Sequence, residues 1–243
     1  MGPRPDALTA AIDEAWRVFD LTAPADLGVC TDCCMDPALA AEMQSRPARA
    51  LSDLHVLEWH DAAFDPAPTH AQVTWLLPRV LVMLADGKAV AHVGNEVAFA
   101  RLPLAGFPDS WPERQVHTLN RFALAYLDMR LTSAPPPLEL SELDHLLCMF
   151  GQGGFDLAPL LRRIEALPDG DLARLLHRTW FHCHSGEIGF DAFWDREPGR
   201  SIAWAWYTSQ TLMDRMERAA LSGSETALEV PALIAETRAK DGL

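Results

Sequence analysis

Apolar residues recur at helical spacing along most of this chain, and no segment shows the sustained alternation that a half-buried strand requires. In residues 6–19, for example, Leu8, Ile12 and Phe19 fall on one face of a helix that Asp6 can cap. We therefore expect an all-α protein, either a compact multi-helix bundle or an α-superhelical array of helical hairpins, with little or no sheet.

Cap residues and prolines predict where individual helices begin. Pro37 suits the first turn of a short helix, and Ser52 suits the cap of the next. Pro78 either kinks a helix that begins near His70 or lies in the first turn of one that begins near Leu77. Both alternatives place a proline inside the most apolar segment of the chain.

Later segments extend this pattern. We expect a short helix at residues 93–101, a long helix after Trp111, and an irregular, aromatic-rich region at 182–200. A strong helical pattern follows through residues 201–221. The sequence thus predicts helices on both sides of one irregular region.

The proline-rich run TSAPPPLEL at residues 132–140 is the best candidate linker. Its prolines remove backbone donors and bias the preceding residues to extended conformations, so a helix cannot continue through it. We expect an N-terminal helical half at residues 1–131 and a C-terminal helical half at residues 141–243, packed as one unit.

The chain is acidic, with 20 Lys and Arg residues against 34 Asp and Glu residues and a formal charge of −14. Its field repels phosphate backbones and anionic lipid surfaces and attracts basic proteins. The first twenty residues lack the basic start and the continuous apolar run of a signal peptide. We expect a cytoplasmic bacterial protein that binds neither nucleic acid nor membranes.

The sharpest local feature is Cys30-x-x-Cys33, whose spacing lets two thiolates reach one zinc ion from a turn. The remaining ligands of such a site are predicted to be His182, Cys183 and His184. Ordinary reduced thiols are the first alternative. A redox pair at a helix N-terminus is the second, although that chemistry expects a preceding strand.

Two other interpretations concern the same region and its aromatic surroundings. His182 or His184 can act as a base beside Cys183 or Cys148 if folding brings them together. The many aromatic residues between 180 and 207 form either a core or a groove, and a groove would offer Trp194, Trp204 and Trp206 to a partner.

The order of Cys30-x-x-Cys33, LSDLHVLEWHDAAF, WLLPRVLVMLADG, FARL and a Trp-led helix resembles a family of uncharacterised bacterial helical proteins with a Cys-x-x-Cys turn and an LPR-containing apolar helix. The resemblance covers roughly residues 10–130 and implies a helical fold without an activity to carry over. The adjacent pair Cys33 and Cys34 and the C-terminal tail depart from that pattern.

No nucleotide-binding loop, GxSxG, HExxH, kinase signature or EF-hand loop occurs in the chain. We therefore expect a non-catalytic, acidic protein-interaction module, of which an immunity or antitoxin-like protein is one version. The alternatives are a metal- or cysteine-dependent enzyme that uses the Cys and His cluster, and a small-molecule binding module. We expect no cofactor, and zinc is the one alternative for which the sequence offers ligands.

Overall fold

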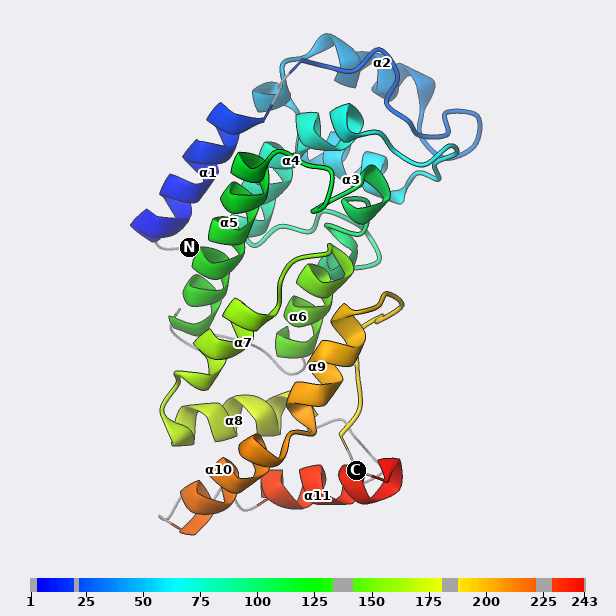
Figure 1. The fold of residues 1–243 in the computed structure, drawn as a ribbon. Helices are drawn as coiled ribbons and strands as arrows, with labels where there is room; N and C mark the ends of the chain where they lie inside the picture. The colour runs from blue at the N-terminus through cyan, green and yellow to red at the C-terminus, as the bar shows by residue number, and fades with distance from the viewer. Residues whose placement is uncertain (1–3, 20–21, 133–141, 181–187, 222–228, 243) are drawn as a thin grey trace. The chain divides into compact units, whose positions relative to one another are not determined.

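The computed structural model describes residues 4–19, 22–132, 142–180, 188–221 and 229–242. Within these ranges all regular structure is helical and no strand is present, which confirms the prediction of an all-α protein (Figure 1). None of the helices in the same ranges has the length and apolar character needed to cross a bilayer.

The chain divides into two compact units. Unit 1 consists of Met1–Met129 with Gln152–Phe155, and unit 2 consists of Arg130–Gly151 with Asp156–Leu243. Most of the predicted linker, residues 133–140, lies outside the described ranges. The division into halves at that linker therefore stays a prediction.

Unit 1 is built around one apolar helix, α4, which packs against α1, α3 and η1 (Figure 1). Trp75, Leu81 and Leu84 of α4 are all fully buried. A helix that is apolar on every side belongs in the middle of its unit. The helices of unit 1 are α1 (Asp6–Val18), α2 (Pro37–Ser45), η1 (Ala48–Ala50), α3 (Asp53–Asp61), α4 (His70–Ala85), η2 (Asn95–Val97), η3 (Pro103–Ala105) and most of α5 (Glu113–Thr132).

The start of α4 decides between the two positions predicted for Pro78. Thr69 Oγ1 accepts the N–H of Gln72, and Gln72 Oε1 accepts the N–H of Thr69 at 2.7 Å, so both residues cap the helix at His70. Pro78 lies inside the helix that follows. The helix that begins near His70 is therefore the correct alternative.

The helix predicted at residues 93–101 is wrong, because only the short 3-10 turn η2 forms there. Gly94 has a φ of 126°, which a right-handed helix does not allow. The side-chain oxygen of Asn95 accepts the N–H of Val90 at 2.9 Å. This local hydrogen bond satisfies a donor outside a helix and stabilises a turn instead.

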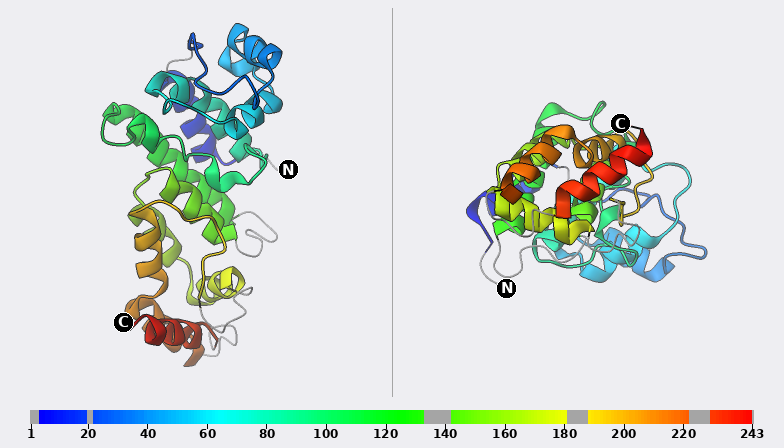
Figure 2. Two further views of the ribbon diagram at one scale, coloured as in Figure 1. Left: turned by 90° about the vertical axis from the view of Figure 1, so that its right-hand side faces the viewer. Right: turned by 90° about the horizontal axis from the view of Figure 1, so that it is seen from below.

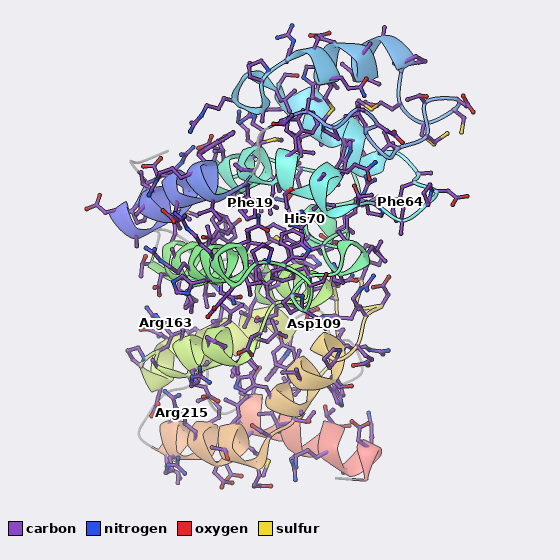
Figure 3. The ribbon with its side chains drawn as sticks, turned by 45° about the horizontal axis from the view of Figure 1, so that its top comes forward. Phe19, Phe64, His70, Asp109, Arg163 and Arg215 are labelled. Atoms are coloured by element: carbon purple, nitrogen blue, oxygen red, sulfur yellow. The ribbon has the colours of Figure 1, made fainter. Side chains whose placement is uncertain are left out.

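In unit 2, α8, α10 and α11 pack against one another (Figure 2). Arg215 of α10 donates from Nε to Asp169 at 2.7 Å and from Nη2 to the carbonyl of Leu167 at 2.6 Å, and so holds the turn before α8 (Figure 3). The helices are α6 (Glu142–Gln152), α7 (Ala158–Glu165), α8 (Asp169–Trp180), α9 (Gly199–Tyr207), α10 (Gln210–Leu221) and α11 (Glu229–Asp241).

The helical pattern at residues 201–221 forms two helices, α9 and α10, rather than one. They are separated at Thr208 and Ser209, where Ser209 Oγ accepts the N–H of Leu212 at 3.2 Å. Arg238 of α11 donates to the carbonyl of Thr208 at 2.6 Å. The break is stabilised at both helices, because Ser209 caps the start of α10 and Arg238 binds a carbonyl at the end of α9.

His60 of α3 provides a pH-dependent contribution to stability. Its Nδ1 lies 2.9 Å from the carbonyl of Val56 and its Nε2 3.2 Å from that of Ala98. Burial lowers the pKa of His60 to about 4. Because this pKa lies below the value of about 6.5 in an unfolded chain, stability is lost as pH falls from 6.5 to 4.

We expect the protonation of His60 to lower the free energy of unfolding by about 3 kcal/mol over this pH range. Urea unfolding of the wild type and of His60→Asn at pH 7 and pH 4.5 measures it, because carboxylates that titrate in both proteins cancel in the difference. The wild type should lose more stability on acidification than the variant. Equal losses would show that His60 does not titrate in this way.

Candidate metal centre

The cysteine turn lies in the loop between α1 and α2, and neighbouring helices fix both its approach and its position. The indole N–H of Trp59, on α3, donates to the carbonyl of Leu27 at 3.0 Å. The N–H of Cys30 donates to the carbonyl of Ala63 at 2.7 Å. These two hydrogen bonds therefore hold the turn against the end of α3 without any contribution from its thiols.

The far side of the turn is held by its connection to α2. The N–H of Met35 donates to the carbonyl of Cys30 at 3.1 Å, and the Met35 side chain is buried. Asp36 then caps α2 by accepting the N–H of Ala38 at 2.7 Å. Cys33 and Cys34 lie between these fixed points and remain exposed.

The turn gathers three thiol groups within reach of one ion. The Sγ atoms of Cys30 and Cys33 are 3.6 Å apart, and those of Cys33 and Cys34 are 3.5 Å apart. All three Sγ atoms lie within 4.8 Å of one another. Tetrahedral zinc with Zn–S bonds of about 2.3 Å separates its sulfur ligands by about 3.8 Å. These three cysteines can therefore hold a metal ion.

The surroundings of the thiols favour one thiolate but oppose several. Hydrogen bonds from the backbone N–H groups of Cys33 and Asp32 lower the pKa of Cys30. Hydrogen bonds with the Cys34 and Cys30 thiols, together with the charge of these neighbours, raise the pKa of Cys33 to about 11. A bound cation would remove this obstacle, because it compensates the repulsion among neighbouring thiolates.

Cys34 is the member of this group that the sequence pattern did not select. The prediction rested on the spacing of Cys30 and Cys33, which matches half of a structural zinc site. In the turn the Sγ atoms of Cys33 and Cys34 lie 3.5 Å apart, so the neighbouring thiol reaches the same place. A third cysteine directly beside the motif was the available signal.

The other predicted metal ligands, His182, Cys183 and His184, lie outside the described residues. Within the described ranges, the group of Cys30, Cys33 and Cys34 is the only set of three or more His, Cys, Asp or Glu residues close enough to share an ion. The predicted participation of residues 182–184 stays a prediction.

The described residues bear on two of the alternatives to a metal site, the redox pair and the nucleophilic cysteine, whereas ordinary reduced thiols stay a prediction. No strand precedes Cys30 there, so the α/β context of a thioredoxin-like pair is missing. Cys148, considered above as a nucleophile, is fully buried on α6. The thiols of Cys30, Cys33 and Cys34 are free in this structure.

The three tryptophans predicted to face a partner have different environments in unit 2. Trp194 is buried and its indole N–H donates to Asp144 at 2.9 Å. Trp206 is also buried and donates to Glu165 at 2.8 Å. Trp204 is half-buried, its indole N–H donates to Asp241 at 2.9 Å, and its ring lines a pocket. Of the three, Trp204 is therefore the one placed to contact another molecule in this conformation.

Comparisons of the chain with protein-family models, with curated proteins and with solved structures find no match.

Proposed function

We propose that this chain is a zinc-binding helical protein in which Cys30, Cys33 and Cys34 are the ligands. The observation that carries the proposal is the approach of their three Sγ atoms to within 4.8 Å of one another. Thiolates are soft ligands that select zinc, Cu(I) or iron–sulfur clusters over magnesium and calcium. Zinc is favoured because the two shortest sulfur separations are close to those of tetrahedral coordination.

Three protein ligands leave one tetrahedral position open. Water, a donor from another molecule, or one of His182, Cys183 and His184 would fill it. The ion would add a third fixed point to a turn that Ala63 and the buried Met35 already hold. We therefore propose that the ion stabilises this exposed turn and presents its open position to the solvent side.

The proposal predicts about one zinc ion per chain in protein purified without a chelator or a metal-affinity tag. Elemental analysis should show that Cys30→Ser, Cys33→Ser and Cys34→Ser each reduce the zinc content, and that Cys30→Ser/Cys33→Ser abolishes it. Removal of the ion by a chelator should make three further thiols reactive. Cys148→Ala is the matched control, because the buried Cys148 lies on α6 and should not affect the metal.

A wild-type protein that is metal-free and does not bind added zinc would contradict the proposal. Cadmium or Cu(I) can replace the ion as a probe of its ligands. Coordination of either metal by the Cys30, Cys33 and Cys34 thiolates should give an ultraviolet charge-transfer absorption. His182→Ala/Cys183→Ser/His184→Ala tests the fourth ligand. If these residues supply it, this variant should bind zinc more weakly than the wild type. An unchanged affinity would assign the position to water or to another molecule.

A second candidate function is favoured by the charge of −14. We propose that the acidic chain associates with a basic protein, as an immunity or antitoxin-like module would. Opposite charge accelerates such an encounter, and salt slows it. A partner isolated from the source cells should be basic and should associate more slowly as ionic strength rises. A neutral partner, or a rate that salt does not change, would contradict this function.

A further inference from the structure

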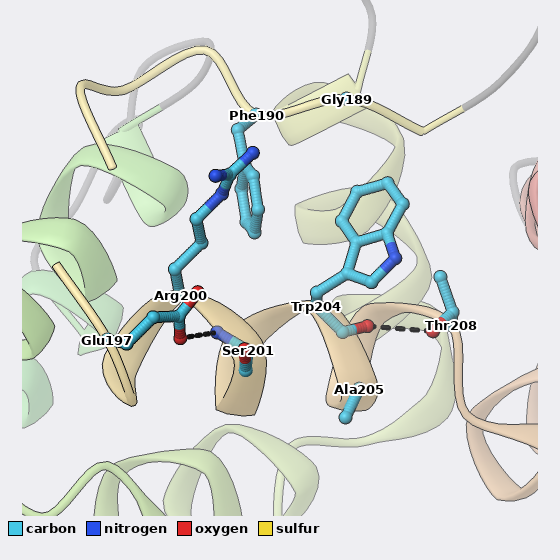
Figure 4. Close-up of a pocket in the computed structure, with 8 residues that line it drawn as sticks. All are labelled: Gly189, Phe190, Glu197, Arg200, Ser201, Trp204, Ala205 and Thr208. Carbon is cyan, nitrogen blue, oxygen red and sulfur yellow. Dashed lines mark hydrogen bonds between the residues drawn. The ribbon is translucent and has the colours of Figure 1, made fainter. Parts of the chain in front are cut away.

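A pocket of about 630 Å³ in unit 2 lies far along the sequence from the cysteine turn, against α9 and the segment before it (Figure 4). Its volume is in the range of about 300–1,000 Å³ that is typical of small-molecule sites. Side chains of α9 and of the residues that flank it line the pocket. Arg200, Ser201, Trp204 and Ala205 belong to α9, whereas Glu197 precedes the helix and Thr208 follows it.

Helical spacing places Arg200 beside Trp204 and Ser201 beside Ala205, because residues four apart on a helix lie on the same face. Phe190 adds a wall from the preceding segment, and its ring centroid lies 5.1 Å from that of Trp204. The Phe190 ring also contacts two buried aromatic residues, Trp194 at 5.1 Å and Tyr207 at 6.1 Å between ring centroids. This support gives the pocket an apolar surface that is fixed in place.

The two charged side chains of the pocket, Glu197 and Arg200, have different partners. The carboxylate of Glu197 accepts the backbone N–H of Ser201 at 3.0 Å, and bonds to Ser201 lower its pKa. The guanidinium of Arg200 lies 5.9 Å from the Phe190 ring centroid and forms no direct ion pair with an acid among the described residues, although its charge also contributes to the lowered pKa of Glu197. Figure 4 shows the Arg200 side chain extending along Phe190 at the edge of the pocket.

We propose that this pocket binds a small amphipathic anion, in which a carboxylate or sulfonate is attached to an aromatic or aliphatic body. Arg200 receives the anionic group, because its planar guanidinium can donate two parallel hydrogen bonds to it. Phe190 and Trp204 cover the apolar body. In a chain of charge −14, a guanidinium that lies beside the Phe190 ring and has no direct ion pair among the described residues gives this pocket a preference for anions that the general surface opposes.

Two fluorescent probes separate the two parts of this proposal. 1-Anilinonaphthalene-8-sulfonate carries an anion, and N-phenyl-1-naphthylamine has nearly the same aromatic body without a charge. The wild type should bind one equivalent of the sulfonate. Arg200→Gln should weaken the sulfonate at least tenfold, as the loss of a charge-assisted hydrogen bond implies, and should change the affinity of the neutral probe less than twofold.

Arg196→Gln is the matched control, because Arg196 lies in the same segment but does not line the pocket. Ala205→Glu adds a negative charge at an exposed lining position of α9, and it should also weaken the sulfonate more than the neutral probe. Circular dichroism and thermal unfolding verify that each variant is folded. Equal affinity of Arg200→Gln and Arg196→Gln for the sulfonate would overturn the proposal, as would binding that Ala205→Glu leaves unchanged.

Discussion

Replacing Asp144 with alanine should destabilise the protein by about 3–5 kcal/mol, because the change removes the acceptor of three hydrogen bonds at a buried position. Asp144 is 1% exposed. Its Oδ2 accepts the N–H groups of Asp191 and Ala192, each at 2.8 Å, and its Oδ1 accepts the indole N–H of Trp194 at 2.9 Å. Alanine would leave three donors without an acceptor, and each unpaired buried donor costs roughly 1–3 kcal/mol.

The Asp144 bonds hold the irregular segment that leads into the pocket. Burial raises the pKa of Asp144, whereas the three donors oppose that rise. Asp156→Ala is the matched control, because Asp156 is exposed and accepts one N–H, that of Ala158 at 2.9 Å. Loss of one such exposed hydrogen bond costs about 1 kcal/mol. Equal destabilisation of the two variants in urea would contradict the role of Asp144.

Local signals in the sequence were sufficient for much of the fold. Pro37 begins α2, and Ser52 caps α3 by accepting the N–H of His55. These features depend on residues close together in the chain, so a sequence pattern can contain them. The failed helix at residues 93–101 depended on the backbone of Gly94 and on a side-chain bond of Asn95, which apolar spacing does not report.

The candidate sites were harder to predict, because they depend on how the chain turns. Cys-x-x-Cys spacing indicated Cys30 and Cys33, whereas the third thiol, Cys34, required the geometry of the turn. The density of aromatic residues around Trp204 indicated either a core or a groove in this region. It could not show that Trp194 would be buried on Asp144, because that contact joins residues 50 positions apart in the chain.

The second large loss of stability is expected at Gly199, where α9 approaches the backbone of α6. A Cβ atom on Gly199 would lie 2.8 Å from the Cα of Gly151 and 3.0 Å from its carbonyl carbon and oxygen. These are backbone atoms, so no side chain can rotate away to make room. Only a shift of one helix against the other would relieve the contact, and such overpacking typically costs 1–3 kcal/mol.

We therefore expect Gly199→Ala to destabilise the protein by about 3 kcal/mol, at the upper end of that range. Gly170→Ala is the matched control in unit 2, because a Cβ there would lie 3.6 Å from the nearest atom, at the end of the Arg174 side chain. Gly170 lies within α8, where alanine should stabilise the helix by roughly 0.5–1 kcal/mol. Opposite signs in thermal unfolding would show that helix contact, rather than backbone entropy, requires glycine at position 199. If Gly199→Ala were as stable as the wild type, α6 and α9 could not approach each other as closely as their backbones do here.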